Sequence, residues 1–420
     1  MCTRKTAIAV WMILGLAALM AFLIYLYPPV HRQVNYRADL AFTYLRGVIQ
    51  PAGPVPTSLP QPTAALGSAS TPTVLPTLVL PSPTSTGTTA TPLPPTPSPT
   101  PLPEAISLPA PAWEVQDINN CGPASLAMFL RFYGWEGNQY DISNLIKPIP
   151  EDRNVNPEEL VYYVRTRAGW LDAEFRVNGN LDLLKQLLAA GFPVLIEESF
   201  YFEDPFWPND DLWAAHYLLL TAYDQASQTF TGQDSFHGPD QKIPYATLAD
   251  YWRIFNRVYL LVYPPAQEAT IRSLLGTDWD LDANRQHALE ASQAETRADP
   301  KDAYAWFNLG SNLVYFERYA EAANAYDTAR QLGLPQRMLR YQFGPFFAYF
   351  HAQRNQDLLA LTQYALQRTP NSEEALLWHG WGLYRDGNTA GAVREWRTAL
   401  LARPGFEDAL YALNFVGASP

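Results

Sequence analysis

The spacing of hydrophobic residues divides the chain into stretches of different periodicity. Residues 7–27 form an uncharged apolar run of 21 residues, the length that a helix needs to cross a bilayer. Residues 122–133 place apolar side chains at helical intervals, whereas 192–197 and the run beginning at His216 have the pattern of buried strands. Helices followed by antiparallel strands predict an α+β domain, and helical periodicity returns from about residue 299.

The apolar run predicts a membrane anchor. Arg4 and Lys5 precede it, and no small-residue cleavage site follows, so an uncleaved signal anchor is favoured over a cleaved signal peptide. This interpretation makes 1–6 a cytoplasmic N-terminus and 7–27 a single transmembrane helix. Residues 28–49 then form a juxtamembrane segment, either a helix near the surface or a segment without defined structure.

Residues 50–112 are dominated by Pro, Thr and Ser and offer no apolar face to bury. Such a composition predicts an extended, disordered linker. Charges flanking the apolar run barely decide its orientation, but a stalk of this kind suits the outer side of a membrane. We therefore expect a single-pass protein of the cytoplasmic membrane, with its N-terminus inside and residues 28–420 extracytoplasmic.

Glycine and apolar positions recur in the C-terminal third. Pro335, Pro370 and Pro404 lie 35 and 34 residues apart. The pattern resembles the tetratricopeptide family, whose period is 34 residues. Two strong copies are carried by Trp306, Leu309, Gly310, Leu313, Ala322, Tyr326 and Ala329, and by Leu376, Gly380, Leu383, Gly387, Ala392, Trp396, Ala399 and Pro404.

Between the strong copies lies a degenerate one, with Phe346 where glycine is expected. A single helix at 281–298 precedes the array and a half-repeat at 408–416 closes it. The resemblance implies a solenoid over 278–417 that presents a concave surface to a peptide or protein partner. The alternative is that these repeats serve only as a rigid packing partner for the preceding domain.

Cys121 is the residue on which the functional interpretation depends. The pattern places it where the 122–133 helix begins, after the N-cap candidates Asn119 and Asn120 and just before Pro123. The positive end of a helix stabilises a thiolate there. Downstream, His216 begins one strand and Asp234 ends the next.

The order Gln116, Cys121, His216, Asp234 resembles that of papain-like cysteine peptidases. More closely, about residues 113–264 resemble the family that processes double-glycine leaders of bacteriocins, which implies a papain-like peptidase domain over 113–266. The segments that match are Gln116, Asn120–Pro123, Met128, Tyr133–Gly134, Gly191–Val194, His216–Tyr217, Asp234, Tyr251–Trp252 and Asn256–Tyr259. Gln116 lies five residues before Cys121 instead of the usual six, and Asn120 stands where an acid is common.

The resemblance implies a Cys121–His216–Asp234 triad, with Gln116 in the oxyanion hole. A membrane-anchored peptidase acting on peptides or proteins is the first hypothesis. A catalytically silent binding module is the second, and a thiol acyltransferase or an amidase on cell-wall peptides is the third. No Gly-x-x-x-x-Gly-Lys-Ser/Thr loop occurs, so an ATPase domain and bacteriocin export do not carry over.

Residues 200–213 are unusually aromatic for a connecting loop. They predict either a wall over the substrate cleft, with Trp207, Trp213 and the nearby Tyr217 as cleft candidates, or a loop packed on the domain's own core. Asp210 and Asp211 in the same segment favour a basic substrate.

The remaining chemistry is sparse. Asp204, His237 and Asp240 match no metal motif with His216, so neither metal nor cofactor is expected. The net charge of −12 argues against nucleic acid as a partner. The cysteines are Cys2 and Cys121, far apart in the chain, which makes an intrachain disulfide framework implausible.

Overall fold

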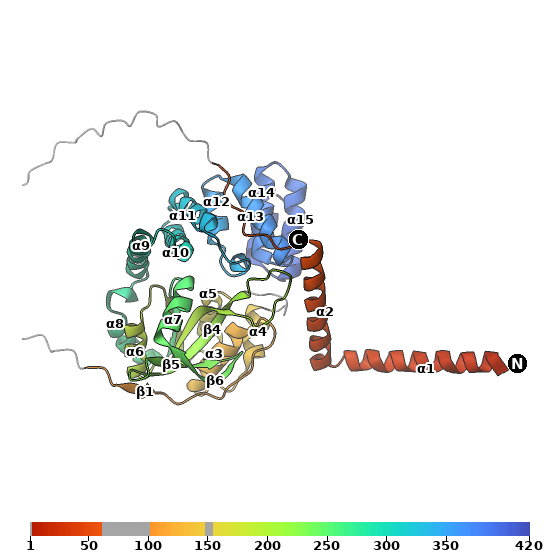
Figure 1. The fold of residues 1–420 in the computed structure, drawn as a ribbon, viewed down its shortest axis with the longest axis horizontal. Helices are drawn as coiled ribbons and strands as arrows, with labels where there is room; N and C mark the ends of the chain where they lie inside the picture. Colours follow the sequence, from red (N-terminus) through yellow and green to blue (C-terminus); the bar gives the residue numbers. More distant parts are fainter. Residues whose placement is uncertain (1, 61–100, 148–153) are drawn as a thin grey trace, which may run out of the picture.

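The computed structural model describes residues 2–60, 101–147 and 154–420. Figure 1 shows a domain of helices and strands, a second domain made of helices alone, and an N-terminal helix that projects away from both. The α+β organisation followed by an all-α array is therefore the architecture of the chain.

An antiparallel sheet forms the centre of the first domain. Its strand order is β2-β7-β3-β4-β5-β6, and β1 pairs with the far end of β4. The strands are β1 (Ala105–Ser107), β2 (Asp172–Arg176), β3 (Val194–Tyr201), β4 (Trp213–Asp224), β5 (Thr229–Asp234), β6 (Gly238–Pro244) and β7 (Tyr259–Tyr263).

Helices cover both faces of this sheet. One face carries α3 (Cys121–Phe132), α4 (Gln139–Ile146) and α5 (Pro157–Arg167), and the other α6 (Leu181–Ala189), α7 (Tyr245–Trp252) and α8 (Glu268–Leu275). Neighbouring strand residues point to opposite faces. Leu219 therefore packs with α3, whereas Leu218 packs with α6 and α7. Each face of the sheet thus has its own hydrophobic core.

The second domain is an array of helices. A first helix, α9, is followed by the pairs α10–α11, α12–α13 and α14–α15, and then by α16. The bounds are α9 (Leu281–Ala298), α10 (Ala303–Tyr315), α11 (Tyr319–Leu332), α12 (Gly344–His351), α13 (Asn355–Arg368), α14 (Glu373–Arg385), α15 (Thr389–Ala402) and α16 (Glu407–Phe415).

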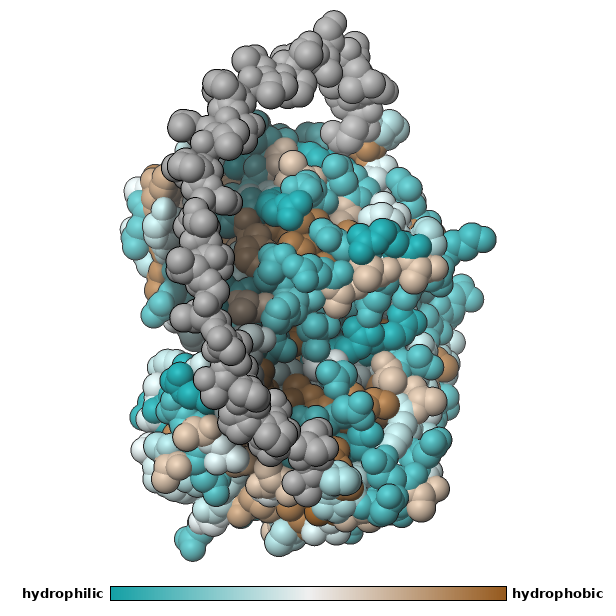
Figure 2. All heavy atoms as spheres, turned by 90° about the vertical axis from the view of Figure 1, so that its left-hand side faces the viewer, coloured by the Kyte–Doolittle hydropathy of each residue, from teal (hydrophilic) through white to brown (hydrophobic). Residues whose placement is uncertain are grey.

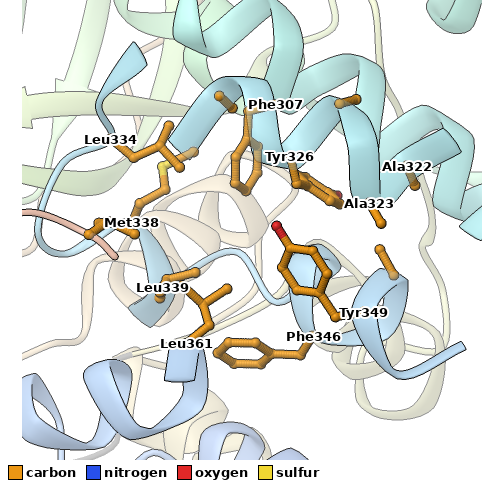
Figure 3. Close-up of a cluster of buried hydrophobic side chains, with 14 of the residues drawn as sticks. Phe307, Ala322, Ala323, Tyr326, Leu334, Met338, Leu339, Phe346, Tyr349 and Leu361 are labelled. Carbon is orange, nitrogen blue, oxygen red and sulfur yellow. The ribbon is translucent and has the colours of Figure 1, made fainter. Parts of the chain in front are cut away.

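Residue size explains why the middle repeat is degenerate. A Cβ on Gly310 would lie 2.7 Å from the Tyr326 ring, and one on Gly380 would lie 2.3 Å from Trp396. At the corresponding positions of α12 and α13 the sizes are exchanged: Phe346 is large and Thr362 is small, and both are fully buried. Figure 3 shows Phe346 next to Leu361 and below Tyr349 in the core that joins these repeats.

The N-terminal segment forms two helices, α1 (Cys2–Tyr25) and α2 (Pro28–Ile49), with a proline in the first turn of α2. Helix α1 includes Arg4 and Lys5 and extends away from the domains (Figure 1). Among the helices of the described ranges, none combines the length and apolarity required for a membrane crossing. The structure therefore does not support the transmembrane helix expected at 7–27. Most of these residues belong instead to helix α1 (Cys2–Tyr25).

The ends of the expected linker are folded parts of the molecule. Val55 is buried in the core of the second domain, and Leu59 donates its backbone N–H to Asp357 at 2.9 Å. At the other end, β1 pairs with β4 and brings the start of the first domain forward from the expected residue 113. Strand pairing over so few residues leaves no periodic signal in the sequence. Residues 61–100, the middle of the expected linker, lie outside the described ranges.

Candidate active site

Cys121 is the first residue of α3 and is partly exposed. The N-cap residue Asn120 makes no side-chain cap; its Nδ2 donates instead to Gln139 Oε1 at 2.7 Å. Asn119, just before it, has a φ of 54°, a left-handed conformation that asparagine tolerates. Because no side chain caps this end of α3, its amides and its macrodipole act on the thiol. The expected N-cap position is correct, but the expected side-chain cap is absent.

Contacts with β4 hold this end of α3 in place. Ser125 Oγ donates to the Tyr217 carbonyl at 3.0 Å, and the Tyr217 hydroxyl donates to the Val155 carbonyl at 2.9 Å. Gly122 fits the closely packed junction, since a Cβ there would lie 3.3 Å from both Tyr217 and Val155. Tyr217 is therefore a buried packing residue that positions the helix. It does not line the cleft as the sequence suggested.

His216 lies on β4 beside Cys121 and is 2% exposed. Its Nε2 is 2.9 Å from Asp234 Oδ1 at the end of β5, and the ring also hydrogen-bonds the Cys121 thiol. With Nε2 engaged by the carboxylate, Nδ1 is the nitrogen that meets the sulfur. The structure thus brings Cys121, His216 and Asp234 together in one hydrogen-bonded row.

These contacts lower the pKa of the Cys121 thiol and raise that of the His216 ring, and both directions favour an ion pair. Burial alone raises the pKa of the Cys121 thiol, but hydrogen bonding and attraction from His216, the Tyr217 backbone N–H and the charge of Lys147 lower it overall. Burial likewise opposes protonation of His216, yet the bonds to Asp234 and Cys121 raise its pKa to about 10. Both shifts favour a thiolate and an imidazolium over a neutral thiol and a neutral ring.

Asp234 is held by four hydrogen bonds. Besides His216, its carboxylate binds His237 Nδ1 at 2.7 Å and accepts the backbone N–H groups of Phe236 and His237. Burial raises the pKa of Asp234, but the bonds to both histidines lower it well below its usual range. His237 has no role predicted from the sequence, because its spacing from His216 matches no metal motif. Among the described residues no cluster could hold a metal ion, and His237 braces Asp234 instead.

Two buried glutamates on β3 lie beside the site and are missing from the sequence-based prediction. Glu198 faces His216 across the β3–β4 ladder, and Glu197 faces Tyr217. Burial raises the pKa of Glu198 to about 8, and burial together with the Cys121 charge raises that of Glu197 well above its usual range. Consecutive acids inside an apolar strand were the signal that could have identified them.

Gln116 lies in the same cavity as Cys121 and His216. Its backbone N–H donates to the Ser235 carbonyl at 2.9 Å, and the Ser235 hydroxyl donates to Gln116 Oε1 at 2.9 Å. The bond to Oε1 fixes which way the amide is turned and leaves Nε2 as the donor. Gln116, Cys121 and His216 line the same cavity of about 290 Å³.

The aromatic segment 200–213 is divided between this cavity and the second domain. Phe200, Phe202 and Phe206 line the cavity. Trp213 is buried and stacks on Phe255 with centroids 5.8 Å apart, and Trp207, also buried, borders a small neighbouring cavity. The two tryptophans thus pack the junction between the domains.

The acids of this segment are engaged as well. Asp210 forms a fully buried ion pair with Arg337, and the Gln336 backbone N–H donates to Asp211 at 2.6 Å. They are therefore not free to select a basic substrate. Phenylalanines of segment 200–213 line the cleft, as the first alternative predicted. The tryptophans and acids of the segment pack against the repeats, and not against the core of their own domain as the second alternative predicted.

The comparison with family models decides what this domain is. Residues 107–260 match the model of the Peptidase_C39 like family. This region is a C39-like peptidase domain. The match spans a little over a third of the chain and contains Gln116, Cys121, His216 and Asp234. The comparison with curated proteins found no match.

Solved structures similar to parts of the chain fall into two groups. One group consists of cysteine peptidases and includes xylellain, a cysteine protease from Xylella fastidiosa, with 15% identity, coverage of 39% of this chain and 87% of that one, and a TM-score of 0.31. A double glycine motif protease from an AMS/PCAT transporter has 18% identity, coverage of 38% and 94%, and a TM-score of 0.28. The tetratricopeptide protein YrrB has 20% identity, coverage of 35% and 72%, and a TM-score of 0.29.

Proposed function

We propose that the chain is a cysteine peptidase that hydrolyses peptide bonds in peptide or protein substrates. The observation that supports this most is the hydrogen-bonded row of Cys121, His216 and Asp234 at an uncapped helix N-terminus. The row opens on a cavity lined by side chains of both domains. A nucleophile, a base and an orienting acid in this order are what covalent hydrolysis requires.

In the first half of the reaction, the Cys121 thiolate attacks the carbonyl carbon of the scissile bond. The C–S bond forms, and the negative charge moves to the carbonyl oxygen. The Gln116 amide and the Cys121 backbone N–H stabilise that oxyanion. The C–N bond then breaks as His216 gives its proton to the leaving amine, and a thioester remains on Cys121.

In the second half, His216 takes a proton from water while the water oxygen attacks the thioester carbon. The C–S bond breaks, the carboxylic acid product leaves, and the thiolate–imidazolium pair returns. Asp234 holds the ring in place during both halves and keeps His216 protonated between turnovers.

The test uses the purified full chain and a mixture of peptides analysed by mass spectrometry. We expect new carboxyl and amino termini with the unaltered chain and none with Cys121→Ala. Retention of peptides by the unaltered chain without cleavage would favour the binding-module hypothesis. Products with a new acyl–nitrogen bond, or loss of side-chain ammonia alone, would favour acyl transfer or amidase activity.

The repeat domain would add a surface for a protein partner or substrate. Part of it is already contacted by the chain itself, because the Tyr364 hydroxyl donates to the Gly53 carbonyl at 2.9 Å and Arg330 Nε donates to the Pro56 carbonyl at 2.7 Å. The extracytoplasmic location of residues 28–420 stays a prediction of the sequence.

A further inference from the structure

Helix α2 reaches the cavity that contains Cys121 and His216, although it lies more than 70 residues before them in the chain. Tyr36 of α2 lines that cavity of about 290 Å³. Tyr36 also lines a larger neighbouring cavity of about 750 Å³, together with Leu40 and Tyr44 of the same helix. Phe202, Phe206 and Phe236 line both cavities, so the two are parts of one cleft.

Close contacts hold α2 at this place. A Cβ on Gly47 would lie 2.5 Å from the Cβ of Trp207, so this glycine allows the helix to approach the aromatic segment closely. Directly after the helix, Val55 is buried among residues of the repeat domain, where the segment also makes hydrogen bonds. Helix α2 is thereby tied to both domains, close to the groups proposed to react.

The lining of the cleft indicates what it accepts. Around Cys121 and His216 it is formed largely by aromatic rings and small apolar side chains, namely Tyr36, Phe200, Phe202, Phe236, Tyr341 and Ala215. Asp117, which also lines it, is engaged by the Tyr140 hydroxyl and its neighbour's backbone N–H. Such a surface favours a large apolar side chain over a charged one. Figure 2 views the molecule from the side away from α1 and α2, and shows that face as mostly hydrophilic with small groups of apolar side chains.

We propose that α2 is one wall of the substrate cleft and that Tyr36 is a specificity-determining residue that contacts the substrate. The substrate class is a peptide with a large apolar side chain next to the cleaved bond. This inference rests on the proposed peptidase function and adds a third chain segment to the site. A wall is favoured over a plug because the space beside Cys121 remains open with α2 in place.

The experiment compares full-length chains that differ at position 36. Tyr36→Ala removes the ring, Tyr36→Phe keeps it, and Val34→Ala is the matched control, since Val34 lies on the same helix, is exposed and does not line the cleft. Quenched fluorescent peptides carry either Phe or Ala at the positions flanking the cleaved bond. We expect Tyr36→Ala to lower kcat/KM about tenfold or more for the Phe peptides and little for the Ala peptides.

Val34→Ala should stay near the unaltered chain on both peptides, and Tyr36→Phe, which keeps the ring, should retain the preference for the Phe peptides. An equal effect of Tyr36→Ala on Phe and Ala peptides, or no effect, would overturn the proposal. An increase in rate on every peptide would also overturn it, because α2 would then be an inhibitory cover.

A binding arm separates this inference from the peptidase function. It uses the Cys121→Ser chain with and without Tyr36→Ala, and measures the fluorescence anisotropy of labelled Phe and Ala peptides. A Tyr36-dependent preference for Phe peptides without any cleavage by the unaltered chain would support the cleft and refute the peptidase. Cleavage without that dependence would support the peptidase and refute the cleft. If neither cleavage nor binding occurs, both fail.

Discussion

Residue type and order were enough to identify Cys121, His216 and Asp234. Each of them lies at the start or the end of a helix or strand that the sequence predicts. His237 could not, because its role depends on the turn after β5, where Asp234 accepts two backbone N–H groups and the His237 ring. Tyr217 was misassigned since sequence shows that it neighbours His216 but not that its ring is buried under α3. What a residue touches across the fold decides its role.

Glu198 leads to a prediction about pH and stability. Its pKa rises from 4.5 in the unfolded chain to about 8 in the fold because it is buried, and its Oε2 has no hydrogen-bond partner among the residues that the structure describes. The folded state therefore retains a proton that the unfolded state releases. At low pH this bound proton contributes to the free energy of unfolding. The contribution is lost as the pH rises from about 4.5 to about 8.

Glu198→Gln removes this dependence, so the variant should become more stable than the unaltered chain by about 2 kcal/mol or more at pH 8. The measurement is the free energy of unfolding in urea at several pH values, with the exposed Glu104→Gln as control. Parallel pH curves for Glu198→Gln and the unaltered chain would show that Glu198 is not held protonated in the fold.

At the scale of elements, long periodic helices were the predictable part. The helices of the strong repeats lie where the glycine and apolar pattern placed them, and α9 has the expected bounds 281–298. Strand β1 is three residues long, too short for any periodicity. Helix α2 and the aromatic segment were ambiguous because their apolar residues contact other parts of the chain instead of a local core. Long-range pairing was the missing information.

Gly310 gives a prediction at this scale. Gly310→Ala places a methyl group 2.7 Å from the buried Tyr326 ring, so either the ring or α10 must move. We expect a loss of about 1–3 kcal/mol in the free energy of unfolding, although alanine has the higher helix propensity. Gly169→Ala is the control, since no atom lies within 4 Å of the added carbon. Unfolding in urea measures both, and a Gly310→Ala chain as stable as the unaltered one would refute the close-packing argument.

On the scale of the whole molecule, the two domains share buried polar contacts. Asn256 of the C39-like domain donates its Nδ2 to Asn312 of the repeats at 2.8 Å, and both are buried. A partly exposed ion pair adds to this contact, since Arg403, after the last full repeat, lies 2.7 Å from Glu159 of α5. Because buried polar groups need their partners, these contacts fix one arrangement of the domains. The repeats are therefore at least a rigid packing partner, the alternative raised from the sequence.

Arg337 lies at the centre of this junction. It pairs with Asp210, donates to the Trp213 carbonyl at 3.1 Å and lies 4.1 Å above the Trp207 ring. Arg337→Met would leave Asp210 buried without its partner, and should cost about 3–5 kcal/mol. The exposed pair Arg318–Glu321 is the control, and Arg318→Ala should cost no more than about 1 kcal/mol.

Calorimetry measures this prediction. Arg337→Met should lower the unfolding temperature and separate one joint transition into two. The double variant Asp210→Asn with Arg337→Met should recover part of the loss, because no buried charge is then unpaired. Unfolding indistinguishable from that of the unaltered chain would mean that the domains do not depend on this ion pair.

The ion pair between Cys121 and His216 is the central claim, and the pH dependence of thiol alkylation tests it most directly. The chain carries Cys2→Ser so that iodoacetamide reports on Cys121 alone. A free thiol has a pKa of about 8.5. Because His216 and the Tyr217 N–H lower the pKa of the Cys121 thiol, the alkylation rate should inflect below that value. His216→Ala should move the inflection upward to or beyond that value. An inflection near or above it in the unaltered chain, with no change on His216→Ala, would contradict the account.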